Sequence, residues 1–169
     1  MDVSDYDDAA VVALGGNLPG AYGSSRLLLD AAASRLAQEG LRLLARSAWW
    51  GSAAWPDPTA PAFLNGVVLA ETDLEPLALL ALLRRIERDF GREMGSRNAP
   101  RTLDLDLIAH GRRVLDTPDL VLPHPRAAER LFVMGPLAEA APAWRHPAFG
   151  QTAADLAARA TVGRDAAPL

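Results

Sequence analysis

Two aspartates stand two positions apart, with one leucine between them, in the string Leu103-Asp104-Leu105-Asp106-Leu107. In a β-strand alternate side chains share a face, so both carboxylates would project from one side, roughly 7 Å apart, while the leucines enter a core. Two neighbouring carboxylates repel each other, and a divalent cation relieves that repulsion. Mg²⁺ suits such a pair because it takes one or two carboxylates and completes its octahedron with water and substrate phosphates. On the pattern alone, a strand with a hydrated polar face fits equally well.

A cluster of arginines directly precedes this string: Arg84, Arg85, Arg88, Arg92, Arg97 and Arg101. The first three share a helical segment with Glu87 and Asp89, where a solvated face of paired charges is the simpler interpretation. The last three lie in or beside a loop, where helical pairing does not account for them. Guanidinium groups next to metal-binding carboxylates favour a nucleoside triphosphate site, because Mg²⁺ bridges the phosphates and arginines take the developing charge.

An aromatic ring stands beside an amide at Phe63 and Asn65, which are two residues apart on a predicted strand. Their side chains therefore face the same way, and the amide can pair with the donor and acceptor edge of a heterocycle. Trp49, Trp50 and Trp55 surround the preceding proline-rich loop and are equally consistent with a core.

The composition removes several kinds of chemistry. The chain has no cysteine, and all 17 basic residues are arginine, so thiolates, Schiff-base amines and phosphate-loop lysines are excluded. The glycines from Gly15 to Gly20 imitate a phosphate-binding loop, but Ala21-Tyr22 stands where Lys-Ser/Thr is required, which favours a sharp strand-to-helix turn. The histidines are scattered, and His124 taken alone is typical of a stiff Pro-His-Pro turn.

Hydrophobic periodicity and turn residues predict the elements that must position these groups. We expect strands over 9–14, 41–50, 63–71 and 103–109, helices over 25–39, 75–90 and 152–160, short strands at 114–115 and 120–122, a helical turn at 126–130, and loops over 51–62 and 92–100. The order βαββαβ predicts an α+β, ferredoxin-like antiparallel sheet with helices packed on one face and additional C-terminal elements. Residues 1–169 should form one domain, with 1–8 and 165–169 frayed.

Length and charge narrow the class of protein. With 169 residues, 50% hydrophobic and 22% charged, the chain fits one globular domain. The net charge of −4 argues against nucleic acid as a partner. The acidic start lacks the basic region of a signal peptide, and the run Leu77–Leu83 is too short to span a membrane. We therefore predict a cytoplasmic protein with neither membrane nor nucleic-acid partners, and we further expect a monomer.

Six motifs in order between about Val11 and Leu156 resemble the 6-hydroxymethyl-7,8-dihydropterin pyrophosphokinase (HPPK) family of folate biosynthesis. They are Ala13-Leu14-Gly15-Gly16-Asn17-Leu18, Phe63-Leu64-Asn65, Arg85-Ile86-Glu87, Pro100-Arg101-Thr102-Leu103-Asp104-Leu105-Asp106, Leu122-Pro123-His124-Pro125 and Arg130-Leu131-Phe132. The resemblance implies transfer of the β,γ-pyrophosphoryl group of ATP to the pterin hydroxymethyl oxygen, which releases AMP.

The resemblance also implies a role for each matching residue. Asp104 and Asp106 would hold two Mg²⁺ ions and act in catalysis with Arg92 and Arg101. The implied ATP contacts are Arg84, Glu87, Arg97, Leu107, His124 and Arg130. The implied pterin contacts are Ser52, Ala53, Trp55, Phe63, Asn65 and Phe132.

Two alternatives remain at this stage. Asn98-Ala99 stands where family members commonly carry Trp-Gly, which motivates a non-catalytic member of the same fold that binds nucleotide or pterin. An RNA-binding ferredoxin-like domain would need aromatic residues on its exposed sheet face, where Asp104 and Asp106 stand instead.

Overall fold

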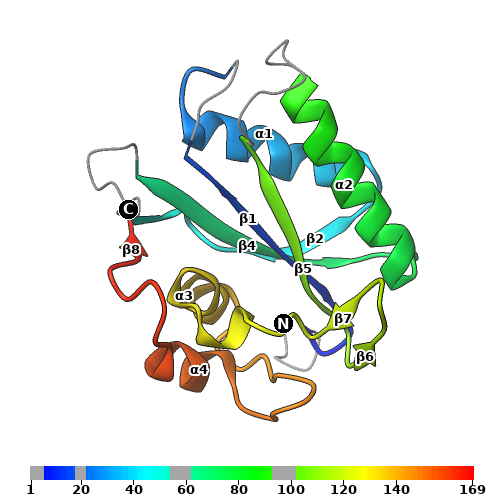
Figure 1. Cartoon of the computed structure of the whole chain (residues 1–169), viewed down its shortest axis with the longest axis vertical. Helices are drawn as coiled ribbons and strands as arrows, with labels where there is room; N and C mark the ends of the chain where they lie inside the picture. The colour runs from blue at the N-terminus through cyan, green and yellow to red at the C-terminus, as the bar shows by residue number, and fades with distance from the viewer. Residues whose placement is uncertain (1–5, 18–21, 54–61, 93–101) are drawn as a thin grey trace.

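The computed structural model describes residues 6–17, 22–53, 62–92 and 102–169, and these form the predicted α+β arrangement (Figure 1). The main sheet within these residues is antiparallel, in the order β5-β1-β4-β3-β8, and β2 also pairs with β4. A two-stranded ribbon, β6-β7, stands beside it. The elements are β1 (Ala10–Gly16), α1 (Ser25–Gln38), β2 (Arg42–Arg46), β3 (Trp50–Ser52), β4 (Phe63–Glu71), α2 (Pro76–Arg92), β5 (Asp104–His110), β6 (Leu115–Asp116), β7 (Val121–Leu122), a 3₁₀ turn (Ala127–Glu129), α3 (Leu131–Ala140), α4 (Ala153–Arg159) and β8 (Ala167–Pro168).

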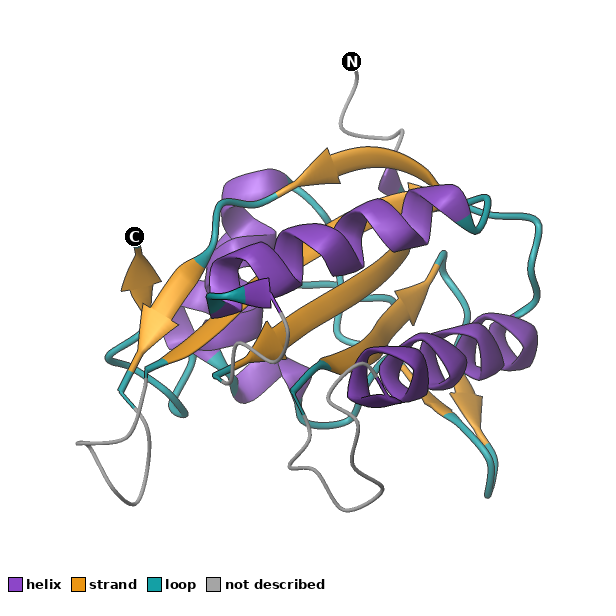
Figure 2. Ribbon diagram, turned by 90° about the horizontal axis from the view of Figure 1, so that it is seen from above, coloured by secondary structure: helices purple, strands orange, loops and turns teal. Residues whose placement is uncertain are grey.

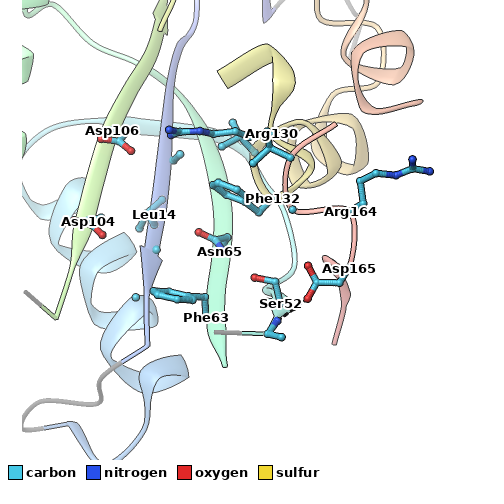
Figure 3. Close-up of a pocket in the computed structure, with 17 residues that line it drawn as sticks. Leu14, Ser52, Phe63, Asn65, Asp104, Asp106, Arg130, Phe132, Arg164 and Asp165 are labelled. Carbon is cyan, nitrogen blue, oxygen red and sulfur yellow. Dashed lines mark hydrogen bonds between the residues drawn. The ribbon is translucent and has the colours of Figure 1, made fainter. Parts of the chain in front are cut away.

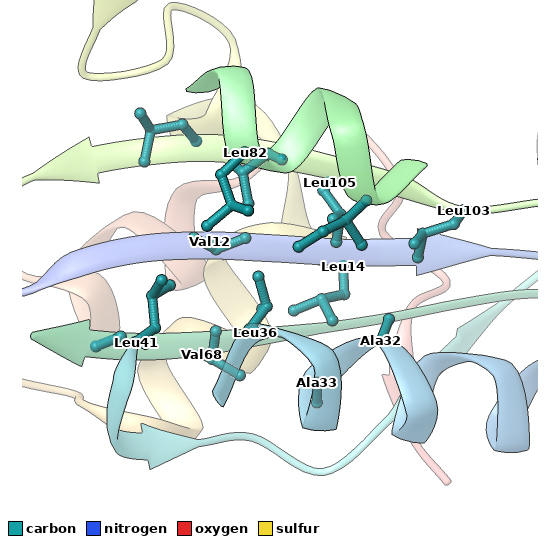
Figure 4. Packing of buried hydrophobic residues seen from close by; sticks show 14 of the residues in the cluster. Val12, Leu14, Ala32, Ala33, Leu36, Leu41, Val68, Leu82, Leu103 and Leu105 are labelled. Atoms are coloured by element: carbon teal, nitrogen blue, oxygen red, sulfur yellow. The ribbon is translucent and has the colours of Figure 1, made fainter. Parts of the chain in front are cut away.

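The two helices of the βαββαβ unit cover one face of the sheet, as predicted. Leucines of α1 and α2 pack there on alternate residues of β1, β4 and β5, among them Val12, Leu14 and Leu105 (Figure 4). The Ser24 hydroxyl caps α1 by accepting a hydrogen bond from the Leu27 N–H at 3.1 Å. Because the stripe of each helix repeats every three or four residues, its apolar side chains reach the sheet together.

The additional C-terminal elements cover the opposite face, where α3 and α4 build a second core. In Figure 2, α1 and α2 lie in front of the strands and α3 and α4 behind them. Met134 and Leu137 of α3, with Trp144 after it, pack on the side chains that β1 and β4 send to this face, including Val11 and Leu69. Strand β1 is therefore buried on both sides, which explains its continuous apolar run.

The predicted strand over 41–50 is two strands in the structure. Both β2 and β3 pair with β4, and the chain between them turns at Ser47. The Ser47 hydroxyl accepts a hydrogen bond from the Val67 N–H at 3.0 Å, so this buried polar group is satisfied within the gap. The break sends Trp49 to the α1 core, whereas the ring of Trp50 lies against Gly135 of α3.

The C-terminal end is a second correction, because residues 165–169 are not frayed. Ala167 and Pro168 form β8 and pair with β3, Ala166 is buried, and the Leu169 N–H donates to the Trp49 carbonyl at 3.1 Å. Sequence periodicity also missed α3, since the prediction there ended with the helical turn at 126–130. None of the described helices is long and apolar enough to cross a membrane.

Candidate active site

A row of residues crosses three strands at one end of the α3 face. Gly15 on β1 pairs with Asn65 on β4 at one side and with Asp104 on β5 at the other. One step along, Ala13 pairs with Asp106. A Cβ on Gly15 would come within 2.5 Å of the Asn65 Oδ1, so the lack of a side chain there makes room for the amide.

The aspartate pair lies as the alternation predicts. Leu105 and Leu107 are buried beneath α2, whereas Asp104 is exposed and Asp106 half-buried, and both aspartates line the same cavity. The described residues contain no group of three or more His, Cys, Asp or Glu side chains that could hold a metal ion. Two carboxylates facing one cavity fit Mg²⁺, which binds through one or two carboxylates together with water and phosphate oxygens.

The main cavity has a volume of about 600 Å³ and is lined by β1, β3, β4, β5, α3 and the C-terminal residues. Phe63 and Phe132 enter it from different elements, and the Asn65 amide lies between them (Figure 3). The side chain of Arg130 extends toward Asp106, and its Cζ stands 5.6 Å from the centre of the Phe132 ring. The cavity is therefore aromatic in its middle and charged on the side of β5.

A second cavity of about 330 Å³ meets the first at Asp106, which lines both. Arg84, Leu107 and His124 also line this second cavity. Burial lowers the pKa of the His124 imidazole below its usual value, and the positive charges of Arg130 and Arg126 act in the same direction against the attraction of Asp106. The neutral imidazole accepts a hydrogen bond at Nδ1 from the Arg126 N–H, at 3.2 Å.

Glu87 does not line the second cavity but contacts Arg84, which does, and holds β5. Its Oε2 accepts the Leu105 N–H at 2.7 Å, and its Oε1 pairs with Arg84. The Arg84 guanidinium in turn donates to the Leu105 carbonyl at 3.0 Å. The two side chains thus satisfy both backbone groups of the residue that stands between the aspartates, on an edge strand.

The structure brings most of the predicted site residues together. The first cavity contains Ser52, Ala53, Phe63, Asn65, Asp104, Asp106, Arg130 and Phe132, and the second contains Arg84, Leu107 and His124. Trp55, Arg97, Arg101 and the side chain of Arg92 lie outside the described residues.

Sequence reasoning missed the wall formed by the C-terminal residues Val162, Gly163, Arg164 and Asp165. The only sequence signal was Gly163, which adopts a φ of +70°.

The profile of the family described as 7,8-dihydro-6-hydroxymethylpterin-pyrophosphokinase (HPPK) matches residues 11–142. The chain belongs to this family. HPPK enzymes transfer a pyrophosphoryl group from ATP to hydroxymethyldihydropterin in folate synthesis. The matched residues contain β1, β4, β5 and α3, and hence both aspartates, and they end before the C-terminal wall of the cavity.

Relatives support the assignment over most of the chain. The 2-amino-4-hydroxy-6-hydroxymethyldihydropteridine pyrophosphokinase of Synechocystis sp. is 41% identical over 147 residues, covering 87% of this chain and 73% of the relative. The enzyme of the same name from Pseudomonas aeruginosa is 42% identical over 136 residues, covering 80% and 82%. Wild-type Plasmodium falciparum HPPK-DHPS shares the fold, with a TM-score of 0.67 at 13% identity, over 89% of this chain and 44% of that longer one.

Proposed function

We propose that this HPPK converts ATP and 6-hydroxymethyl-7,8-dihydropterin into AMP and the pterin diphosphate. The observation that carries the proposal is that Asp106 stands where an aromatic cavity and a cavity lined by arginine and histidine meet. A heterocyclic acceptor fits the first cavity, and the phosphates of a nucleotide fit the second. The reacting oxygen and phosphorus would then come together beside the aspartate pair.

Phe63, Phe132 and Asn65 would hold the pterin. Both rings line the main cavity on either side of Asn65, so they could stack on the heterocycle while the Asn65 amide pairs with its polar edge (Figure 3). The backbone of Ser52 and Ala53 stands at the same wall, and Trp55 is proposed as a further contact. With the ring held in this way, its hydroxymethyl group would face β5.

Asp104 and Asp106 would hold two Mg²⁺ ions. When bound, Mg²⁺ supplies charge neutralisation for the phosphates and lowers the pKa of the hydroxymethyl group. The aspartates would hold the ions on a single strand, in which Glu87 and Arg84 tie the residue between them to α2.

Cationic side chains would hold the nucleotide. Arg130 and Arg84 provide guanidinium groups at the two cavities, and a neutral His124 can donate a hydrogen bond from Nε2 to a phosphate oxygen. From the family resemblance we also propose that Arg92 and Arg101 act in catalysis and that Arg97 and Leu107 contact the nucleotide, whereas Glu87 would act on the nucleotide site through its pairing with Arg84. We also propose that the enzyme is a cytoplasmic monomer without nucleic-acid or membrane partners.

Product analysis tests this function. Incubation with ATP, Mg²⁺ and 6-hydroxymethyl-7,8-dihydropterin should release AMP and no ADP. Asp104→Asn and Asp106→Asn should each lower kcat/KM at least about 1000-fold, roughly 4 kcal/mol of transition-state stabilisation. Asp155→Asn is the matched control, because Asp155 is exposed on α4 and lines neither cavity. Release of ADP, or turnover that survives both site variants, would refute the proposed function.

A further inference from the structure

The C-terminal segment, defined here as Thr161–Leu169, is fastened to the site at both ends. At one end the Val162 carbonyl accepts the Leu131 N–H at 2.9 Å, and the Val162 N–H donates to the Glu129 carbonyl at 2.9 Å. At the other end β8 pairs with β3. The segment therefore joins the turn that carries Arg130 to the strand that carries Ser52.

Close packing fixes the middle of the segment. A Cβ on Gly163 would come within 2.5 Å of the Phe132 Cδ1, and the positive φ of Gly163 excludes most other residues as well. The backbone thus lies directly against one ring of the pterin slot. Four consecutive residues of the segment, from Val162 to Asp165, line the main cavity.

Asp165 is the member of this wall that turns toward the cavity. Its Oδ2 accepts the Ala53 N–H at 2.7 Å, whereas the side chain of Arg164 extends away (Figure 3). The structure shows no hydrogen bond to the Asp165 Oδ1 from another described residue. One carboxylate oxygen is therefore used to hold β3 in place, and the second can accept a bond from a ligand.

The cavity is acidic at two opposite places. Asp104 and Asp106 stand on β5 at one side, Asp165 stands beyond β4 at the other, and Phe63 and Asn65 lie between them (Figure 3). A 6-hydroxymethylpterin also has two different ends. Its hydroxymethyl group is on one ring, and the far edge of the other ring carries two N–H donors, at N3 and the 2-amino group. With the hydroxymethyl group toward β5, those donors point toward the C-terminal segment.

We propose that Asp165 is a specificity-determining residue that accepts hydrogen bonds from the N3–H and 2-amino groups of the pterin. This inference rests on the proposed function, because it takes the orientation of the pterin from the aspartate pair. A carboxylate suits this edge since it offers acceptors only, and charge-assisted bonds are about twice as strong as neutral ones. The Asn65 amide, which has both a donor and an acceptor, would bind the part of the heterocycle where a donor and an acceptor stand side by side.

The test compares two ligands on three forms of the chain, namely wild type, Asp165→Asn and Asp155→Asn. The ligands are 6-hydroxymethyl-7,8-dihydropterin and its analogue with hydrogen in place of the 2-amino group. Their Kd values are measured by calorimetry with Mg²⁺ and a non-hydrolysable ATP analogue. Asp165→Asn is the informative variant, because its Oδ1 can still accept the Ala53 N–H while its amide nitrogen presents a donor to the pterin donors. Asp155→Asn on α4, outside both cavities, is the matched control.

Wild type and Asp155→Asn should prefer the parent pterin over the analogue by about 10-fold or more, and Asp165→Asn should weaken the parent by about 10- to 100-fold. The preference should fall to near unity in Asp165→Asn. An unchanged preference, or equal weakening of both ligands, would overturn the inference and leave the proposed function standing. Failure of wild type to bind the parent pterin would overturn both.

Discussion

The two faces of the sheet are formed by the same strands, but one is closely packed and the other carries the main cavity. On β1, Val12 and Leu14 point to the α1 and α2 side and are fully buried in close-packed leucines. Ala13 and Gly15 point to the α3 side, where the cavity begins. Alternating large and small residues thus make one face a core and leave room on the other for a ligand. Substitutions at different positions of this one strand should therefore alter either stability or ligand binding.

Removing bulk from the core face should have the largest effect on stability. Val12→Ala is expected to lower the free energy of unfolding by about 2–4 kcal/mol, because the fully buried Val12 side chain lines neither cavity and its truncation leaves a void among its core neighbours. Urea unfolding measures this change. AMP release per folded molecule should stay within a few-fold of wild type, and a loss as large as that of Asp106→Asn would break the separation of the faces.

Adding a methyl group on the α3 side of β1 should weaken pterin binding and leave stability almost unchanged. In Gly15→Ala the new Cβ displaces the movable end of Asn65, so the pterin Kd should rise about 10- to 100-fold as one or two oriented hydrogen bonds are lost. Stability should change little. Gly91→Ala on α2 is the control, since a Cβ there meets nothing within 4 Å. Equal pterin affinity in the two variants would show that Asn65 does not orient the pterin.

Glu87 and Arg84 bind the backbone of Leu105 on β5, and loss of Glu87 should have an intermediate effect on stability. Glu87→Ala leaves the Leu105 N–H and the Arg84 guanidinium without their acceptor, so unfolding should become easier by about 1–3 kcal/mol. The Glu87 side chain is only 10% exposed. Glu75, which pairs with Arg113, is 71% exposed, and Glu75→Ala should cost less than about 1 kcal/mol. Denaturant curves that shift equally for both variants would show that the contacts of Glu87 with Leu105 and Arg84 do not stabilise β5.

The smallest expected effect is a pH dependence of the α3 side. Burial lowers the pKa of the His146 imidazole, with Arg112 acting in the same direction, and its Nδ1 accepts the backbone N–H groups of Ala148 and Phe149. The unfolded chain therefore binds the proton more readily, so stability should fall as the pH drops below about 6.5, by on the order of 1 kcal/mol.

His146→Asn keeps an acceptor but cannot titrate. Its loss of stability between pH 7 and pH 5 should therefore be smaller than that of wild type, as thermal unfolding over this range would show. Equal losses in the two proteins would mean that His146 is not responsible.

Sequence patterns within a single element predicted those strands and helices whose structure depends on local sequence. The alternation in β5 placed Asp104 and Asp106 on one face, and helical periodicity with a serine cap placed α1. By contrast, α3 contains Gly135 and Pro136 and is apolar on most sides, so neither periodicity nor propensity indicated it. Tight packing, including Gly135 against Trp50, holds it instead.

The candidate site divides in the same way. Phe63 and Asn65 were predicted because neighbours two apart share a strand face. Asp165 was not predicted, because its approach to Ala53 depends on β8 pairing with a strand more than a hundred residues earlier. Small residues without periodicity surround Asp165, and such a sequence is typical of a frayed end.

Pyrophosphoryl transfer is proposed to take place beside Asp106, where the main cavity on the α3 face meets the second cavity, which residues of α2, β5 and β7 line. The most direct test measures AMP released per folded molecule by wild type, Val12→Ala and Asp106→Asn at saturating ATP, Mg²⁺ and pterin. We predict near-wild-type release for Val12→Ala, because Val12 lines neither cavity, and loss of at least about 1000-fold for Asp106→Asn. Comparable activity in the two variants would contradict this placement of the reaction.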